Sequence, residues 1–389
     1  MHSTPPDSSA SAEPAGRLAG AQALRIFHVA SDKLVELEAL PDAVPATGFL
    51  WLGCTRSRLG AELPGLQAAL QRWADRPLLD LHVSDLLNRH LPSSFDYTSW
   101  YDLLVFRRLA AGGNAAEMLN EDGRQTAAAA RLALDTIDTS PVGFALFDRL
   151  LFTVHPDDCA VREHFAQRLH ANAGGTDHRS AARLPSSPAD LMVRMVNHMV
   201  DTYLDLRRVL TRHLGELQHQ LLDPRSRFED WHVLLHSRNT LHLLEDVCED
   251  QSAAVQEWMD SVEEWPAEPE ADKRHERELL RVRTRDVLEH IQRVLSHVRR
   301  LQQSAETAVQ MHFSALSNRT NNIMRTLTAL TAIFLPLNLI TGFFGMNFEA
   351  LPFIHSPRGV WVAMALMLLI GLGLGGFFWR KRYLSTRKR

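Results

Sequence analysis

Residues 318–352 read NRTNNIMRTLTALTAIFLPLNLITGFFGMNFEALP, and they limit how the chain can fold more than any other stretch of it. Thr326 to Phe344 carry no charged side chain, and neither does a second run from Val360 to Trp379. A helix needs about 20 mostly apolar residues to cross the hydrocarbon core of a bilayer. The sequence therefore predicts two transmembrane helices, over residues 326–345 and 360–379.

The segment between these spans, residues 346–359, is short, so the spans must run antiparallel with this loop on one side of the membrane. Basic residues gather in the tail that follows, residues 380–389, whereas the loop carries only Arg358. Lys and Arg are in excess on the cytoplasmic flanks of spans. We therefore expect both termini in the cytosol and a multi-pass protein in the bacterial inner (plasma) membrane. A buried hairpin in a soluble protein is the alternative, and the basic flank argues against it.

Composition excludes several classes of protein. The net charge of −4 gives no strongly basic surface, so nucleic acid is not an expected partner. Cys54, Cys159 and Cys248 lie far apart, which predicts neither a disulfide framework nor a zinc knuckle. No Gly-rich phosphate loop or nucleophile elbow occurs, so we do not expect an enzyme. Residues 1–20 lack an apolar core segment, and we expect a disordered tail there rather than a secretory signal.

Residues 21–188 mix β-like runs with amphipathic helices, which predicts a cytoplasmic α/β domain with a central sheet. The expected strands are 24–29, 48–54, 101–109, 141–147 and 150–154, with a turn between the last two at Asp148-Arg149. The expected helices are 63–74 and 156–171. Residues 173–188 contain two glycines and two prolines and have the composition of a connector.

After Pro188 the pattern is helical for a long way. Residues 191–222 and about 228–262 predict two helices of an acidic hairpin, 189–265, whose acidic run is either a solvated face or a cation-attracting one. Residues 271–325 predict a stalk helix that continues into the first span, on the order of 110 Å in all at 1.5 Å per residue. Its apolar seam recurs at heptad spacing. The seam residues are Val287, Ile291, Val294, Val298, Leu301, Ala305 and Ala308.

Residues 318–352 strongly resemble the signature of the CorA metal-ion transporter superfamily. The tripeptide Gly345-Met346-Asn347, at the end of one span and followed by a second, is that family's hallmark. The other parts agree in order: an α/β domain, FTVHP at 152–156, paired helices with an acidic run, a long stalk and a basic tail. The resemblance implies a CorA-like, funnel-shaped homopentamer whose stalks and first spans line one central pore for divalent cations.

One pair of spans cannot enclose a polar path through the membrane. A channel would therefore need several copies of this chain. On the first span and its approach, one helical face collects hydroxyl, amide and small groups, with apolar residues between them. An oligomer would place this face on its axis, and packing of helix against helix is the competing interpretation. Met324, Leu327 and Leu335 would form a dry constriction. The predicted pore-lining residues are Asn321, Met324, Leu327, Thr328, Thr331, Leu335, Asn338 and Gly342.

The expected cargo is Mg²⁺, which gives up its bound water reluctantly. In a selectivity filter of Gly345, Met346 and Asn347, a ring of Asn347 amide oxygens would accept hydrogen bonds from that water shell. Glu349 follows the family pattern, and it would concentrate cations at the mouth of the pore.

Three positions depart from the family pattern. The usual Met-Pro-Glu is replaced by Leu351-Pro352-Phe353, Phe344 stands where Tyr is usual, and Asn338 where Thr is common. These changes leave selectivity open between Mg²⁺, Co²⁺, Ni²⁺ and Zn²⁺. The Thr-Gly-Phe-Phe-Gly spelling is also similar to the zinc-transporting ZntB branch.

A regulatory site is implied by the same resemblance. Residues 285–290 resemble the stalk motif that carries an ion-sensing aspartate, which makes Asp286 the candidate metal ligand. Asp85, in SDLLN at 84–88, resembles its partner from the neighbouring subunit. Two facing carboxylates repel unless a hard cation bridges them, so bound Mg²⁺ would lock subunits together and close the pore. Ordinary surface acids are the alternative, and no resident cofactor is expected.

Other functions were weighed. One alternative is a zinc site formed by histidines. His232 and His236 are four residues apart on one predicted helix, with His242 further along, but no HExxH arrangement occurs. The spans contain no acidic or histidine relay, which favours passive flow over proton coupling. A membrane-anchored oligomeric scaffold or sensor without conduction is an alternative of a different class, and the Asn and Thr residues of the first span favour a pore.

Overall fold

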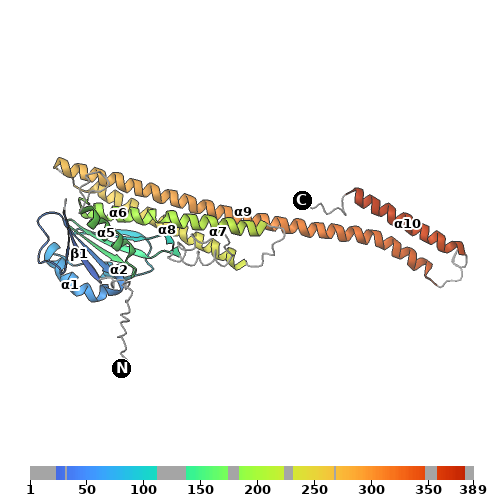
Figure 1. Cartoon of the computed structure of the whole chain (residues 1–389), viewed down its shortest axis with the longest axis horizontal. Helices are drawn as coiled ribbons and strands as arrows, with labels where there is room; N and C mark the ends of the chain where they lie inside the picture. Colours follow the sequence, from blue (N-terminus) through green and yellow to red (C-terminus); the bar gives the residue numbers. More distant parts are fainter. Residues whose placement is uncertain are drawn as a thin grey trace, which may run out of the picture. The chain divides into compact units, whose positions relative to one another are not determined.

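The computed structural model describes residues 23–30, 33–111, 137–173, 184–222, 231–266, 269–346 and 357–381. The chain divides into two compact units. The first consists of Met1–Leu217 and Phe228–Ala305, and the second of Gln218–Arg227 and Glu306–Arg389. The longest helix, α9 (Ala271–Phe344), contributes to both units (Figure 1).

A seven-stranded sheet forms the centre of the first unit, in the order β2-β1-β3-β9-β8-β5-β4. Only β3 and β9 run parallel, and every other neighbouring pair is antiparallel. All five expected strands are confirmed, and so is the turn at Asp148-Arg149. The strands are β1 (Leu24–Val29), β2 (Leu34–Leu37), β3 (Phe49–Thr55), β4 (Ser94–Tyr97), β5 (Asp102–Arg107), β8 (Pro141–Phe147) and β9 (Leu150–His155), with β6 (Ala110–Ala111) and β7 (Ile137–Asp138) in a separate ribbon.

Helices cover both faces of this sheet, which explains why β3, β8 and β9 are buried along their whole length. One face packs against α1 (Arg56–Ala74) and α2 (Asp80–Leu87) through a cluster that includes Leu59, Leu70 and Leu86. The other face packs against α5 (Ala160–Ala173) and α6 (Pro188–Asp201). Figure 1 shows α1 and α5 on opposite sides of the strands.

Three helix boundaries differ from the expectation. Helix α1 begins at Arg56 rather than near Leu63, directly after β3, and α5 begins at Ala160 rather than at Pro156. The single helix expected over 191–222 is two, α6 and α7 (Tyr203–Leu222), separated at Thr202. The Thr202 hydroxyl lies 2.6 Å from the Met199 carbonyl and 3.3 Å from that of Leu109 in the sheet domain. This tertiary contact has no signal in the helical periodicity.

The heptad seam of α9 is confirmed as a buried stripe. Val287, Ile291 and Val298 are buried in the same hydrophobic cluster as Leu206 of α7 and Leu244 of α8 (Trp231–Glu264). The seam therefore packs within one chain, against the neighbouring helices α6, α7 and α8.

The acidic run of α8 partly faces α9. Arg299 binds Glu245 at 2.7 Å and also Glu249, and Arg281 binds Glu263 at 2.6 Å. These ion pairs are exposed and contribute little stability singly, but they set the lateral register of the two helices. Of the remaining acids of the run, Asp250 is half-buried near Arg107 of the sheet, and the others are exposed in the single chain.

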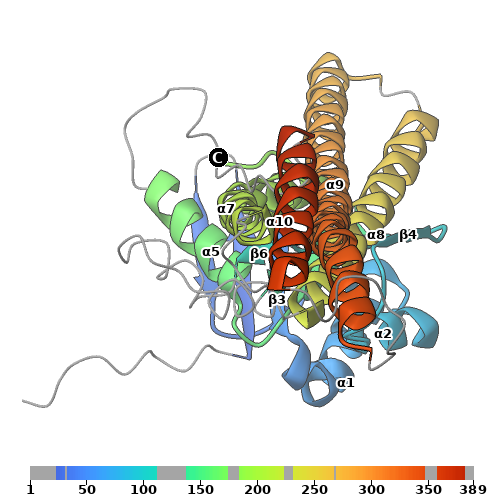
Figure 2. The same ribbon diagram turned by 90° about the vertical axis from the view of Figure 1, so that its right-hand side faces the viewer.

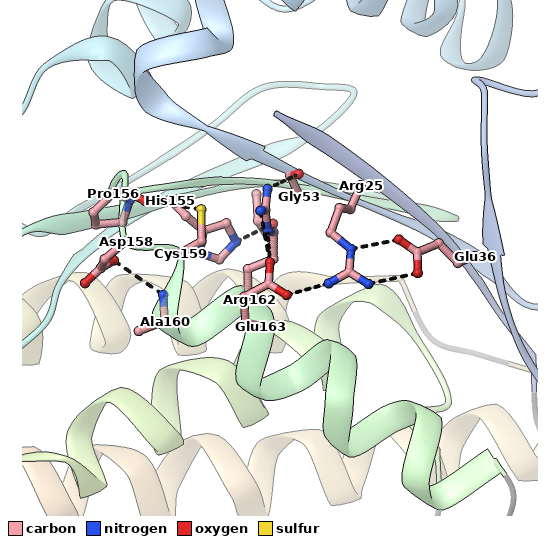
Figure 3. Close-up of polar contacts among 11 residues, drawn as sticks. Arg25, Glu36, Gly53, His155, Pro156, Asp158, Cys159, Ala160, Arg162 and Glu163 are labelled. Atoms are coloured by element: carbon pink, nitrogen blue, oxygen red, sulfur yellow. Dashed lines mark hydrogen bonds and ion pairs between the residues drawn. The ribbon is translucent and has the colours of Figure 1, made fainter. Parts of the chain in front are cut away.

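Arg162 joins α5 to the sheet and has no exposed surface (Figure 3). Its Nη1 donates to the Gly53 carbonyl at 3.1 Å, and its Nη2 lies 3.0 Å from Glu163 Oε1. Glu163 in turn accepts from Arg25 at 2.5 Å. Gly53 is needed here, because a methyl group at that position would lie 2.6 Å from Arg162 Cδ.

Replacing Arg162 with Ala should destabilise the sheet domain by about 2–4 kcal/mol, because the change empties a buried site and removes the side-chain donor to the Gly53 carbonyl and the ion pair with Glu163. Urea unfolding of the detergent-solubilised chain, followed by tryptophan fluorescence, measures the effect. Arg72→Ala is the control, since the exposed pair with Asp42 should contribute less than about 1 kcal/mol. Equal losses in both variants would contradict a specific role for the buried guanidinium.

Stability should also depend on pH through His297, which is buried on α9 with Nδ1 2.7 Å from the Tyr203 hydroxyl. Burial, followed by Arg207 and Arg300, lowers the pKa of His297 from 6.5 to about 4. The unfolded chain therefore binds the extra proton first, so the free energy of unfolding should fall as pH is lowered from about 6.5 to about 4. His297→Gln should flatten that slope in thermal unfolding scans. An unchanged slope would show that other groups, such as His155 and His198, carry the whole dependence.

Candidate ion pathway

Two helices are long and apolar enough to cross a membrane, the end of α9 and α10 (Pro357–Arg380). Almost none of either apolar stretch is buried within the chain. Leu335 is 65% exposed, Leu339 71% and Trp361 73%. Such a continuous apolar surface needs lipid or further protein around it.

The two helices lie side by side in the second unit, as both views show (Figures 1 and 2). Leu337 of α9 faces Gly371 of α10, where a methyl group would lie 3.9 Å from Leu337 Cδ1. Small residues at such contacts let helix backbones approach closely. Between residues 326 and 344 only one stripe of α9 is buried or half-buried. Its members are Thr326, Ala329, Ala332, Ile333, Pro336, Leu337, Ile340 and Phe344.

The face expected to line a pore lies on the far side of α9 from this stripe. Each residue of an α-helix turns by about 100°. On that count Met324, Thr331 and Gly342 lie about 160–180° from Ile333, the middle of the stripe that faces α10. All of the expected pore-lining residues are exposed in the single chain: Asn321, Met324, Leu327, Thr328, Thr331, Leu335, Asn338 and Gly342.

The threonine hydroxyls on this face have a defined polarity. Thr328 donates to the Met324 carbonyl at 2.8 Å, and Thr331 donates to the Leu327 carbonyl at 2.9 Å. Each hydroxyl has one proton, so its outward lone pairs can only accept. These oxygens therefore suit the water protons around a cation and would not favour a bare anion.

Helix α9 ends where the expected filter begins. The Gly345 N–H donates to the Thr341 carbonyl at 2.9 Å and the Met346 N–H to that of Phe343 at 3.4 Å. A methyl group on Gly345 would lie 3.0 Å from the Thr341 oxygen, so this turn favours glycine. Asn347 and Glu349 lie outside the described residues.

The two candidate sensing acids occupy different layers of the first unit. Asp85 is half-buried on α2, which packs on one face of the sheet. Asp286 is 59% exposed on α9, whose seam belongs to the cluster on the other face. The fold therefore does not pair them within one chain, and a shared cation would have to join two chains.

The described residues give no support to a metal site formed by the histidines. Across the described ranges, no group of three or more His, Cys, Asp or Glu side chains is placed to hold a metal ion. His242 lies 2.8 Å from the Gln302 amide nitrogen, and the side chain of His232 lies outside the description.

A polar groove between α5, α6 and α9 was not foreseen. Its cavity has a volume of about 230 Å³, and its lining includes Arg168, Asn197 and Asp201 along with Asp286. A signal was present, because Arg194, Asn197, His198 and Asp201 recur at helical spacing in an otherwise apolar stretch. The partners from α5 and α9 have no such local signal.

Comparisons with known proteins agree with this architecture. The family described as "CorA-like Mg2+ transporter protein" matches residues 127–382. The cobalt/magnesium transport protein CorA of Thermotoga maritima is 33% identical over 100 residues, which is 26% of this chain and 28% of that protein. The putative metal ion transporter YfjQ of Bacillus subtilis is 30% identical over 103 residues, 26% of this chain and 32% of that protein. In these alignments the chain matches about a third or less of each relative's length.

Solved structures also resemble most of the chain, and two examples follow. The complete CorA magnesium transporter from Methanocaldococcus jannaschii aligns with a TM-score of 0.68 at 18% identity, covering 92% of this chain and 97% of that one. The full-length CmaX protein aligns with a TM-score of 0.51 at 17% identity over the same shares. The α/β domain, long helix and two C-terminal apolar helices are thus a known arrangement, and the chain belongs to the CorA-like Mg²⁺ transporter family.

Proposed function

We propose that the chain assembles into a homopentameric channel that carries hydrated Mg²⁺ through a pore lined by the polar face of α9. The supporting observation is the position of that face, about 180° from the stripe that faces α10. If the α10 helices form the outer ring of the pentamer, the Asn, Thr and Gly positions of α9 face the pore axis. The flanking Leu and Phe residues then face neighbouring subunits or lipid. The names of the relatives, which concern magnesium and cobalt, agree with a divalent cation.

The chemistry of the face fits a cation that keeps its water. Carboxylates are absent from the eight positions, so an ion would be passed on rather than trapped. The Thr328 and Thr331 oxygens can accept from the ion's water shell, and the Asn338 amide adds another acceptor. In this proposal Gly345, Met346 and Asn347 form the filter, and Glu349 attracts cations to its mouth. The transported ion is the cargo, and we propose no resident cofactor.

In the cell, we place the protein in the inner membrane with both termini in the cytosol, as the basic tail after α10 favours. The negative interior would then draw cations inward. Asp286 and the Asp85 of a neighbouring subunit would share Mg²⁺ when it is abundant, which would favour the closed state. A zinc-selective transporter is the second candidate, because two positions depart from the magnesium pattern. Phe344 stands where Tyr is usual, and Phe353 stands where the loop usually carries Glu.

The orientation of α9 predicts which positions meet water. In an otherwise cysteine-free chain, Thr331→Cys should be modified by a charged thiol reagent added to the aqueous phase, and modification should block flux. Leu330→Cys lies at the same depth but turned by about 100°, so it should react far more slowly. Equal reactivity at the two positions would contradict an axial polar face.

Ion flux tests the filter directly. Proteoliposomes loaded with Mg²⁺- or Zn²⁺-sensitive dyes should show Mg²⁺ entry, and Asn347→Ala should reduce it at least about tenfold, the effect of about 1.4 kcal/mol at a barrier. Asn322→Ala is the matched control, since Asn322 lies on the α10 side of α9. Zinc entry without magnesium, dependent on a pH gradient, would support the second candidate. No flux of either ion from an assembled oligomer would leave a scaffold or sensor.

A further inference from the structure

Helix α10 carries a tryptophan at each end of its apolar stretch. Trp361 and Trp379 are each 73% exposed. They are eighteen residues apart, so they lie on the same face of the helix, about five turns and about 27 Å from one another. Leu368 and Leu372, both exposed, lie between them on that face. Tryptophan is enriched where the hydrocarbon core, about 30 Å thick, meets the headgroups. The two rings therefore mark the two surfaces of the core.

The contact between α9 and α10 gives the depth of each residue of α9. The two helices lie side by side and run in opposite directions (Figures 1 and 2). Leu337 lies against Gly371, so Asn338 is level with Ile370. Ile370 is nine residues from each of the two tryptophans. Asn338 therefore lies near the middle of the hydrocarbon core, roughly 13 Å from either surface.

Hydrogen-bonding side chains are few at this depth. On residues 330–346, the part of α9 level with α10 between its tryptophans, they are Thr331, Asn338 and Thr341. The Thr331 hydroxyl donates to a carbonyl of the preceding turn at 2.9 Å, and the Thr341 hydroxyl donates to the Asn338 carbonyl at 3.0 Å. The Asn338 carboxamide is exposed in the single chain, and it has no hydrogen-bond partner among the described residues. It is therefore the one polar side chain of this stretch that its own helix does not satisfy.

The partner of this carboxamide has to come from outside the chain. An unpaired amide in hydrocarbon is strongly unfavourable, and the facing stretch of α10 carries no amide, hydroxyl or charged side chain. Asn338 is also turned by about 140° from Ile333, the middle of the stripe that faces α10. Water around a cation turns its hydrogens outward. Such water can satisfy the acceptor Oδ1 of Asn338 and leaves the hydrogens on Nδ2 without an acceptor.

We propose that the Asn338 carboxamides of neighbouring copies of this chain hydrogen bond to one another in a closed ring at the middle of the bilayer. Each Nδ2 donates to the Oδ1 of the next copy, and the second lone pair of each Oδ1 remains for the water around the ion. The ring rests on the proposed assembly around the polar face of α9. It adds the contact that fixes the register of the copies, as a polar residue in an apolar helix seam does.

A threonine at this position separates the contact between copies from the polarity of the face. In Asn338→Thr the new hydroxyl should donate to the Phe334 carbonyl, as the Thr328 and Thr331 hydroxyls donate to carbonyls four residues back. The variant keeps an oxygen acceptor on the face and loses the donor to the next copy. Its copies should therefore still present a polar face and hold together less strongly.

Subunit exchange tests the ring. The full chain in detergent is labelled with a donor or an acceptor dye, and energy transfer is followed after mixing. Asn338→Thr should exchange subunits at least about tenfold faster than the wild type. Asn321→Thr is the matched control on the predicted pore face. It lies about 25 Å from Asn338, beyond the level of Trp379, where water can serve the amide, so it should exchange as the wild type does. Unchanged exchange in Asn338→Thr, or equal acceleration in both variants, would overturn the proposal and leave Asn338 in contact with pore water alone.

A second variant separates the amide from the space that the side chain fills. Asn338→Gln keeps the carboxamide and should exchange subunits more slowly than Asn338→Thr. Equal rates in these two variants would show that side-chain shape carries the effect, and would overturn the ring. Ion flux is measured on the same samples. Faster exchange in Asn338→Thr, with a wild type that conducts neither ion, would refute the channel and support the ring. Conduction with unchanged exchange would support the channel and refute the ring.

Discussion

In hydrocarbon every backbone N–H and C=O must find its partner within the protein, and this requirement shapes α9 and α10. Both apolar segments are helical from end to end, and Pro336 lies inside α9 as the one residue there without an N–H to donate. Thr328 and Thr331 follow the same rule, because their hydroxyl protons bond carbonyls of the preceding turn. What these hydroxyls present outward is therefore a pair of acceptors, and that polarity underlies the proposed selectivity for cations.

The sheet domain meets a different constraint, the burial of positive charge. Arg162 and Arg56 are both buried. Arg162 is held by the Gly53 carbonyl and the Glu163 carboxylate, and Arg56 by the carbonyl oxygens of Leu86 and Pro141. Burial lowers the pKa of Arg56 to about 10 and that of the nearby His155 to about 3. A neutral His155 is compatible with these guanidinium groups, and a charged one would repel them. The carboxyl edge of β3 and β9 is therefore a structural junction that fixes α1 and α5.

Regulation and conduction would use different chemistry in this chain. The pore face offers neutral oxygen and amide groups, which suit rapid passage. The groove of the first unit is lined by full charges of both signs. Asp286 belongs to the proposed sensing pair and also lines this groove.

Much of this architecture could be predicted from local pattern. The two spans, the strands of the sheet and the seam at Val287, Ile291 and Val298 all follow from uncharged length or from periodicity, which neighbouring residues carry. The break at Thr202, the burial of Arg162 and the groove that Arg168, Asp201 and Asp286 line together depended on contacts between segments far apart in sequence. The same holds for the opposition between the polar face of α9 and the stripe against α10, because only the packing of α10 determines which side of α9 remains free. Periodicity identifies a face, and tertiary contacts determine what that face meets.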